Sequence, residues 1–149
     1  EKIADIRVRH SKLTGIAVPP ERAASMIDEY PVLSVAASVA TGQTVMQGVA
    51  ELRVKETDRI KVMADGLAMA GVTVTYDENS MTVTGGTIKG GVSIASQHDH
   101  RIAMSFLTLG MVAEESITVT GCETINTSFP GFADLINECG GAITAPDAE

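Results

Sequence analysis

Two short charged segments hold most of the side chains that could do chemistry. The first is ELRVKETDRI, Glu51–Ile60, in which Lys55 and Arg59 flank Glu56. These cations stand out because the whole chain carries a formal net charge of −8. A local cluster of ammonium and guanidinium groups can still hold a small anion on an acidic protein. The segment therefore predicts an anion site with a carboxylate at its centre.

The second segment is HDHRIAMSF, in which His100 and Arg101 directly follow Asp99. Both segments come just before apolar residues at helical spacing, and a helix N-terminus favours anions over cations by roughly 0.3 to 1 kcal/mol. Asp99 is therefore an expected helix cap, whereas Arg59 and Arg101 are not. An arginine beside a helix N-terminus is a good receptor for a carboxylate or phosphate. The alternative is that Arg59 pairs with Glu56, and Arg101 with Asp99, on a solvated face.

Three groups near these arginines could move protons. Glu56 lies between two cations that keep it ionised, whereas burial would favour its protonated form, so the site could tune it for proton transfer. His100 could tune or relay that proton. Asp28 is either the N-cap of a helix or a general base. The ordinary alternatives for the first two are a salt-bridged glutamate and a hydrogen-bonded core histidine.

Hydrophobic periodicity predicts the elements that position these residues. Alternating apolar side chains indicate strands, and apolar residues spaced by three and four indicate helices. In the first half this predicts a strand over Ile3–His10, a buried helix over Ser25–Ala40 with Pro31 in its first turn, a strand over Thr44–Val54, a helix over Asp58–Ala70 with Asp58 as its cap, and a hairpin of Val72–Tyr76 with Met81–Thr84.

After the glycine-rich stretch Gly85–Gly91 a similar order restarts. It predicts a strand over Val92–Ser96, a helix over Asp99–Ala113, a strand over Ile117–Ile125, a helix over Pro130–Cys139 and a strand over Ala142–Thr144.

Spacing within the sequence supports a repeat. Asp28 lies 20 residues before Gly48, and Arg101 lies 20 residues before Gly121, which gives a period of about 73 residues. We therefore predict an α/β fold of two repeated βαβα-type units with extra strands. Residues 1–85 form a first βαβαββ unit and residues 86–149 a second βαβαβ unit.

Composition narrows the classes of function. Of the 149 residues, 44% are hydrophobic but only 3% aromatic, which suits a tightly packed aliphatic α/β core. The negative net charge argues against a nucleic-acid surface, because phosphate backbones are held by many cations. No apolar run approaches the roughly 18 to 20 residues that a membrane helix needs, and nothing resembles a signal peptide. We therefore predict a cytoplasmic protein with no nucleic-acid or membrane partner.

Cysteines and the first residue add two expectations. Cys122 and Cys139 lack the spacing of a zinc site or a disulfide framework, so we expect two reduced thiols and no metal site. The chain opens at Glu1 rather than a methionine and runs directly into a strand pattern. We expect it to have been cut from a longer polypeptide.

Four segments closely resemble, in order and spacing, the last third of the 5-enolpyruvylshikimate-3-phosphate synthase family. They are MIDEYPVLSVAASVA, ELRVKETDRI, HDHRIAMSF and TSFPGF. The resemblance covers essentially the whole chain, and MIDEYP and TSFP are more similar to the glyphosate-tolerant bacterial subgroup of this glyphosate-targeted family. The UDP-N-acetylglucosamine enolpyruvyl transferase family shares the fold but not DHRIAMSF, and it is the alternative.

This resemblance implies a fold and a reaction. The fold is the inside-out α/β barrel of the enolpyruvyl transferases, in which the two units would belong to one of two domains. The reaction moves the enolpyruvyl group of phosphoenolpyruvate to the 5-hydroxyl of shikimate 3-phosphate and releases phosphate through a tetrahedral intermediate. The resemblance also implies a monomer that needs no organic cofactor and no catalytic metal.

The resemblance assigns a proton-moving role to three residues. Asp28 matches the carboxylate that hydrogen-bonds the acceptor hydroxyl and helps to take its proton. Glu56 matches the acid that protonates the methylene carbon of phosphoenolpyruvate, and His100 matches the neighbouring histidine.

It assigns substrate binding to three others. Lys55 matches a lysine that contacts shikimate 3-phosphate, and Arg59 and Arg101 match two arginines that hold the carboxylate and phosphate end of phosphoenolpyruvate. The chain departs from some members at two positions: Glu51 stands where they have an asparagine, and Thr127 where they have a lysine.

The active site of this family lies in the cleft between two domains. We therefore expect the isolated chain to fold but not to turn over, because proximity and closure supply much of an enzyme's acceleration. Two alternatives are a stand-alone anion-binding module, which would bind phosphoenolpyruvate unaided, and a structural piece that binds nothing until the rest of the enzyme is added.

Overall fold

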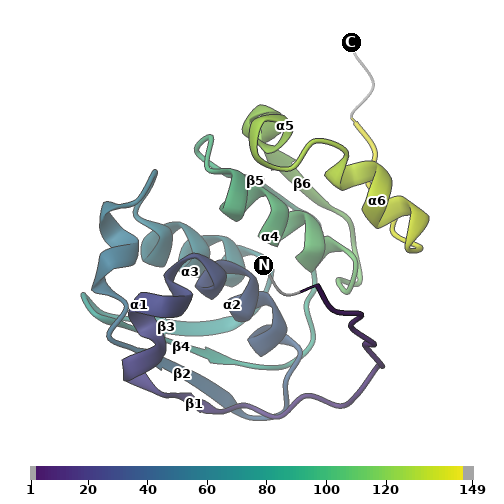
Figure 1. Cartoon of the computed structure of the whole chain (residues 1–149). Coiled ribbons are helices and arrows are strands. Elements are labelled where there is room, and N and C mark those ends of the chain that lie inside the picture. Colours follow the sequence, from purple (N-terminus) through teal and green to yellow (C-terminus); the bar gives the residue numbers. More distant parts are fainter. Residues whose placement is uncertain (1–2, 146–149) are drawn as a thin grey trace.

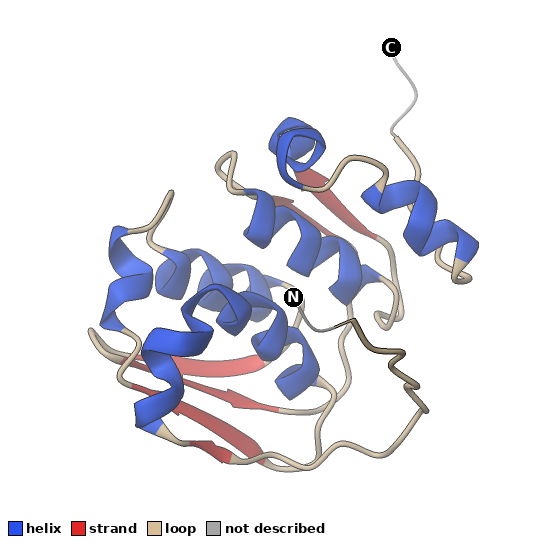
Figure 2. Ribbon diagram, viewed as in Figure 1, coloured by secondary structure: helices blue, strands red, loops and turns tan. Residues whose placement is uncertain are grey.

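The computed structural model describes residues 3–145, which form two sheets with helices packed against them (Figure 1, Figure 2). The larger sheet has the strand order β1-β2-β4-β3 and the smaller pairs β5 with β6. The strands are β1 (Ala17–Val18), β2 (Gln43–Gln47), β3 (Thr73–Tyr76), β4 (Ser80–Thr84), β5 (Val92–Ala95) and β6 (Ile117–Thr120).

Both sheets begin with a parallel pair. β1 lies parallel to β2 with Ala17 opposite Val45, and β5 lies parallel to β6 with Val92 opposite Ile117. In the larger sheet β4 then adds antiparallel to β2, and the predicted hairpin places β3 antiparallel to β4. A parallel pair needs a crossover connection, and helices supply it in both halves.

Residues 3–145 also form six α-helices and four short 3₁₀ segments. The helices are α1 (Ala23–Met26), α2 (Tyr30–Ser38), α3 (Arg59–Met69), α4 (His100–Gly110), α5 (Ile125–Ser128) and α6 (Phe132–Glu138). The 3₁₀ segments are η1 (Pro20–Arg22), η2 (Ile27–Glu29), η3 (Ala50–Val54) and η4 (Cys122–Thr124). Of these elements, η4, α5 and α6 follow the last strand and the others lie between strands. Within residues 3–145, every helix is too short or too polar to traverse a lipid bilayer.

The two predicted aspartate caps are confirmed. The Asp58 carboxylate accepts from the backbone N–H of Lys61 at 3.0 Å and so begins α3. The Asp99 carboxylate accepts from the backbone N–H groups of Arg101 and Ile102 at 3.0 and 3.3 Å and so begins α4. Each bond satisfies donors that a helix N-terminus leaves without an intrahelical partner.

One core joins the two sheets. Apolar side chains from α2, α3 and α4 pack with those of β2, β4 and β5 in a single buried cluster. Helices α3 and α4 approach closely because Gly66 has no side chain: a Cβ there would lie 2.2 Å from Cζ of Phe106. This contact sets the distance between the two helices whose N-termini carry the charged segments.

The first predicted strand is wrong. Residues Ile3–His10 form no strand and are exposed throughout, and the larger sheet begins at β1 instead. An alternating segment becomes a strand only when a neighbouring strand takes up its backbone hydrogen bonds, and the described residues offer it none.

Both predicted long strands are too long, and for the same reason. β2 ends at Gln47 because Gly48 has a left-handed φ of 76°, and β6 ends at Thr120 because Gly121 has a φ of 75°. A 3₁₀ segment follows each glycine closely. The matching conformations of two glycines 73 residues apart support the period that was counted from the sequence.

Two other predictions need correction. The predicted helix over Ser25–Ala40 is divided into α1, η2 and α2, although Pro31 does lie in the first turn of α2. Residues Ala142–Thr144 form no strand. The predicted boundary between units 1–85 and 86–149 stays a prediction.

Candidate active site

Arg59 is the centre of the charged cluster. It is the first residue of α3 and only 1% exposed. Its Nη1 donates to Oδ1 of Asp28 at 2.9 Å, its Nη2 to Oε2 of Glu56 at 2.5 Å, and its Nε to Oδ2 of Asp99 at 2.8 Å. A buried guanidinium is tolerated when its donors are paired with carboxylates, and here every nitrogen has one.

Asp99 ties the beginnings of α3 and α4 together. It is fully buried, caps α4 and accepts from Arg59 through both carboxylate oxygens. The hydroxyl of Thr57 donates a further bond to it at 3.2 Å. Burial acts to raise the pKa of Asp99, but the hydrogen bonds and charge of Arg59 outweigh burial and hold that pKa below its ordinary value. Asp99 is therefore an ionised, structural partner of Arg59.

Asp28 is shared by the two arginines. It lies in η2, and its second carboxylate oxygen is 3.5 Å from Nη2 of Arg101. Nη1 of Arg101 also donates to the backbone carbonyl of Asp28 at 3.2 Å. Asp28 and Arg101 lie 73 residues apart, which is the predicted period, and they meet near the contact between α2 and α4. Asp28 is not the cap of α2, whose N-cap residue is Glu29.

Lys55 and Glu56 lie at the open side of the cluster. Lys55 follows η3, and its Nζ donates to Oε1 of Glu51 at 2.6 Å. That hydrogen bond raises the pKa of Lys55. The side chain of Glu56 is 51% exposed although it binds the buried Arg59. Solvent can therefore reach the carboxylate but not the guanidinium behind it.

His100, a predicted site residue, and Thr127, which stands where some relatives have a lysine, make no polar contact with the Arg59 cluster among the described residues. His100 is the first residue of α4 and half-buried, and its side chain makes no hydrogen bond or ion pair within residues 3–145. The Thr127 hydroxyl donates to the carbonyl of Thr124 at 2.8 Å, inside the turn of α5. Four of the six predicted site residues are thus joined by direct polar contacts, namely Asp28, Glu56, Arg59 and Arg101. Lys55 and His100 adjoin this cluster in sequence, beside Glu56 and Asp99.

Of the two ion pairs that the sequence offered as an alternative, Arg59 with Glu56 and Arg101 with Asp99, only the first is present. Arg59 does pair with Glu56, but on a buried rather than a solvated face. The side chain of Arg101 pairs with Asp28 rather than with Asp99. The bond between Arg59 and Asp99 joins residues 40 positions apart, so local spacing held no signal for it beyond the capping pattern.

Arg53 was also missed as a positioning residue. Its guanidinium donates to the carbonyls of Asp77 and Glu78, at 2.5 and 3.0 Å, and to the carboxylate of Asp58 at 2.5 Å. Arg53 therefore fixes η3 between the β3–β4 turn and the start of α3. The loop that carries Lys55 and Glu56 is held from behind by these bonds.

A small cavity adjoins the cluster. Its volume is about 200 Å³, and its lining includes Asp28, Arg101, Phe129 and Phe132. Arg101 is about one-third exposed, unlike Arg59, so its guanidinium is the more accessible of the two. Within residues 3–145 no group of three or more histidine, cysteine, aspartate or glutamate side chains converges on a common metal position. Cys122 and Cys139 are both unpaired thiols.

A family model described as EPSP synthase (3-phosphoshikimate 1-carboxyvinyltransferase) matches residues 1–136. The chain belongs to the EPSP synthase family. The 3-phosphoshikimate 1-carboxyvinyltransferase of Cereibacter sphaeroides is 56% identical over 146 residues, which cover 97% of this chain and 33% of that relative. The corresponding protein of Phenylobacterium zucineum is 54% identical over 142 residues, 94% of this chain and 31% of that relative.

Solved EPSP synthase structures have the same fold. Two from Acinetobacter baumannii superpose with TM-scores of 0.82 and 0.84 at 47% and 42% identity. They cover 85% and 91% of this chain, and 30% and 32% of their own chains. The predicted α/β enolpyruvyl transferase fold is thereby confirmed. The chain spans about a third of the length of the EPSP synthase relatives that it matches.

Proposed function

We propose that this chain supplies part of the active site of an enzyme that transfers the enolpyruvyl group of phosphoenolpyruvate to the 5-hydroxyl of shikimate 3-phosphate. One observation carries the proposal: a chain of the EPSP synthase family brings Asp28, Arg59 and Arg101 together from separate segments, although they are far apart in sequence. Guanidinium groups bind the phosphate and carboxylate oxygens of anionic substrates. A carboxylate between them can accept or donate a proton during the reaction.

The chemistry requires three proton movements, two during addition and one during elimination. The acceptor hydroxyl loses its proton as its oxygen bonds to C2 of phosphoenolpyruvate, and the methylene carbon C3 gains one. Phosphate then leaves from C2 while C3 gives a proton back, which restores the double bond. Asp28 takes the hydroxyl proton in this proposal, and Glu56 gives and recovers the proton at C3. His100, at the start of the neighbouring helix, assists Glu56.

Substrate anions are held by the three cations. Arg101 and Lys55 are accessible and can bind phosphate or carboxylate oxygens directly. Arg59 is fully engaged by carboxylates, so a substrate anion reaches it only if one of them withdraws. Glu56 is the carboxylate that withdraws most easily, because its side chain is 51% exposed, against 38% for Asp28 and 0% for Asp99. Substrate binding thus frees the acid that the reaction needs.

The remaining parts of the proposal follow the family. The whole enzyme is a cytoplasmic monomer that uses neither an organic cofactor nor a catalytic metal. Residues 1–149 alone fold but do not turn over, because the cluster is open to water on one side and exposed ion pairs are weak. A UDP-N-acetylglucosamine enolpyruvyl transferase activity and a stand-alone anion-binding module are the competing functions.

A chimera tests the proposal. Residues 1–149 would replace the matching third of the Cereibacter sphaeroides relative, whose sequence is 56% identical there. We expect phosphate release that depends on both phosphoenolpyruvate and shikimate 3-phosphate. A folded chimera that releases no phosphate, or one that accepts UDP-N-acetylglucosamine instead, would refute the assignment.

Calorimetry on residues 1–149 distinguishes the binding module. Phosphoenolpyruvate would be titrated with and without shikimate 3-phosphate. Millimolar or weaker binding agrees with part of an active site, since micromolar binding requires about 8 kcal/mol that an open, water-screened site does not provide. Micromolar binding without the acceptor would identify an anion-binding module.

A further inference from the structure

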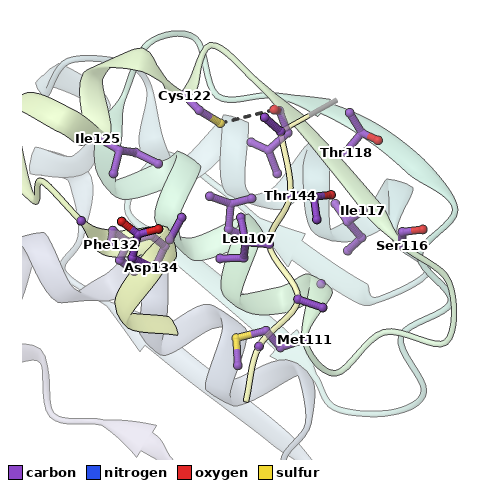
Figure 3. A pocket seen from close by; sticks show the side chains of 18 of the residues that line it. Leu107, Met111, Ser116, Ile117, Thr118, Cys122, Ile125, Phe132, Asp134 and Thr144 are labelled. Carbon is purple, nitrogen blue, oxygen red and sulfur yellow. Dashed lines mark hydrogen bonds between the residues drawn. The ribbon is translucent and has the colours of Figure 1, made fainter. Parts of the chain in front are cut away.

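A second cavity, beside the smaller sheet, adds nothing to the proposed reaction. Its volume is about 890 Å³, and its lining includes β6 and residues 140–145 (Figure 3). Among the described residues that line it, Asp134 is the single charged one, and none of the six predicted site residues is present. Phosphorylated substrates are held mainly by cations. A further determinant of the reaction is therefore to be found around Arg59 instead.

The loop of residues 55–57 joins η3 to α3 and carries Glu56, the proposed acid. Glu56 accepts from Arg59, the first residue of α3. Thr57 makes a different contact, because its hydroxyl donates to Oδ2 of Asp99, the cap of α4, at 3.2 Å. Within residues 3–145 this is the one side-chain hydrogen bond that connects the 55–57 loop with α4 and its cap.

Asp99 is a rigid anchor for that bond. It is fully buried and accepts four other hydrogen bonds, two from the guanidinium of Arg59 and one each from the backbone N–H groups of Arg101 and Ile102. All four donors belong to the first turns of α3 and α4. A buried carboxylate with this many partners keeps one orientation, so a group bonded to it is also held in place.

The base of the loop is closed from the other side. Arg53, before the loop, donates to the carboxylate of Asp58, directly after it, at 2.5 Å. This bond keeps the two ends of the loop together but does not reach α4. The direction in which the loop leans therefore depends on Thr57.

The contacts of Glu56 and Thr57 close a ring. Glu56 binds Arg59 at 2.5 Å, Arg59 binds Asp99 at 2.8 Å, Asp99 accepts from Thr57, and the peptide bond between residues 56 and 57 completes the ring. Solvent reaches the link between Glu56 and Arg59, because the Glu56 side chain is 51% exposed whereas those of Arg59 and Asp99 are 1% and 0% exposed. When that link opens, the bond from Thr57 still ties the loop to the buried side of the ring.

We propose that Thr57 is a positioning residue for the reaction, whose bond to Asp99 keeps the 55–57 loop in place when Glu56 leaves Arg59 to move a proton. The inference rests on the proposed function, in which substrate binding frees Glu56. A freed carboxylate on a loop without this bond would sample many positions, whereas reacting atoms must be held about 3 to 3.5 Å apart. Thr57 thus acts through Glu56 rather than on the substrate.

Substitutions at Thr57 in the chimera test this role. Thr57→Val keeps the shape but removes the donor, and Thr57→Ser keeps the donor. We expect kcat for phosphate release to fall roughly tenfold to a hundredfold in Thr57→Val, the scale of a displacement of about 1 Å. The KM for phosphoenolpyruvate should stay unchanged, because Arg59 and Arg101 remain in place, and Thr57→Ser should recover most of the lost rate.

Thr82→Val is the matched control. Thr82 is half-buried like Thr57, but it lies on β4 and its hydroxyl makes no hydrogen bond within residues 3–145. The control should keep the kcat of the parent chimera. Thr57→Val should still fold, because Asp99 keeps four of its five donors. Thr57→Ala, which removes the donor and puts no methyl group in its place, gives the same comparison if valine does not fit.

A double-mutant cycle separates positioning from a general structural role. If Thr57 acts through Glu56, Thr57→Val should have little effect in a chimera that already carries Glu56→Gln, because residues that act as a unit are not additive. A contribution to folding alone would lower kcat by the same factor in both backgrounds.

The parent chimera distinguishes failure of the inference from failure of the proposed function. A folded parent chimera that releases no phosphate would refute the proposed function and the role of Thr57 with it. An active parent chimera in which Thr57→Val and Thr57→Ser have equal kcat, or in which Thr57→Val causes equal losses with and without Glu56→Gln, would overturn the role of Thr57 alone.

Discussion

The beginnings of α3 and α4 carry the same residue type in two different environments. Arg59 at the start of α3 is buried and bound by three carboxylates, whereas Arg101 in the first turn of α4 is about one-third exposed and bound by one. An arginine with all its nitrogens engaged organises its neighbours, and one with accessible donors can bind a ligand. The comparison divides the cluster into a structural side and a binding side.

Asp99→Ala, on the structural side, should cause the largest loss of stability among the changes considered. Asp99→Ala leaves the Arg59 guanidinium without its one fully buried carboxylate partner, and breaking a buried pair in this way costs about 3 to 5 kcal/mol. The free energy of unfolding would be measured by urea titration. Asp99→Asn keeps the shape and part of the hydrogen bonding and should cost less. A loss below about 1 kcal/mol for Asp99→Ala would mean that solvent already compensates Arg59.

The second-largest loss of stability should come from forcing α3 and α4 apart. Gly66→Ala puts a methyl group 2.2 Å from the Phe106 ring, so α3 and α4 must separate. Overpacking of this kind costs about 1 to 3 kcal/mol, and it should also disturb the bonds between Arg59 and Asp99. Gly86→Ala is the matched control, because no atom lies within 4 Å of a Cβ placed there. Equal unfolding free energies for the two variants would argue against a close helix contact.

The dependence of stability on acid pH tests the structural side separately. The pKa of Asp99 is lower in the folded chain than the ordinary aspartate value of 3.8. A carboxylate with a lowered pKa stabilises the fold above its unfolded-state pKa, and this contribution is lost as pH falls through the folded-state value. The parent chain should therefore lose stability below about pH 4, the ordinary aspartate range. Asp77, whose pKa is lowered by the backbone N–H of Asn79, adds to this loss. Asp99→Asn should show a shallower acid loss than the parent, and an unchanged slope would exclude Asp99 as a source.

The binding side should change stability least. Arg101→Ala removes a partly exposed pair with Asp28 and one bond to a carbonyl, so its effect on unfolding should stay within about 1 kcal/mol. In the chimera the same change should sharply lower the rate of phosphate release. A large loss of stability would move Arg101 to the structural side and remove the distinction.

Local patterns predicted the parts of this fold that depend on local physics. The caps Asp58 and Asp99, the helices they begin and the β3–β4 hairpin follow from capping chemistry and alternation. Residues 3–10 and 142–144 carry strand patterns but have no ladder partner among the described residues, so pattern and structure differ. A strand depends on its neighbours in space, and the period of a sequence does not report whether they are present.

The candidate site was likewise predicted only where it depends on local sequence. The charged segments were found from residue types and spacing, because an arginine in the first turn of a helix opposes the helix dipole and needs an explanation. The burial of Arg59 and its bond to Asp99 depend on how α3 packs against α4. That contact joins residues 40 positions apart, and neither segment encodes it alone.

The most direct measurement of the central claim is phosphate release by the chimera carrying Glu56→Gln. Glu29→Gln is the matched control, since Glu29 is exposed and its side chain makes no polar contact within residues 3–145. If Glu56 moves the proton at C3 of phosphoenolpyruvate, its loss should slow the reaction by about 10² to 10⁴, the range typical of general acid–base groups. The control should keep nearly the full rate. Equal rates for the two variants would contradict the assignment of Glu56 as the group that moves this proton.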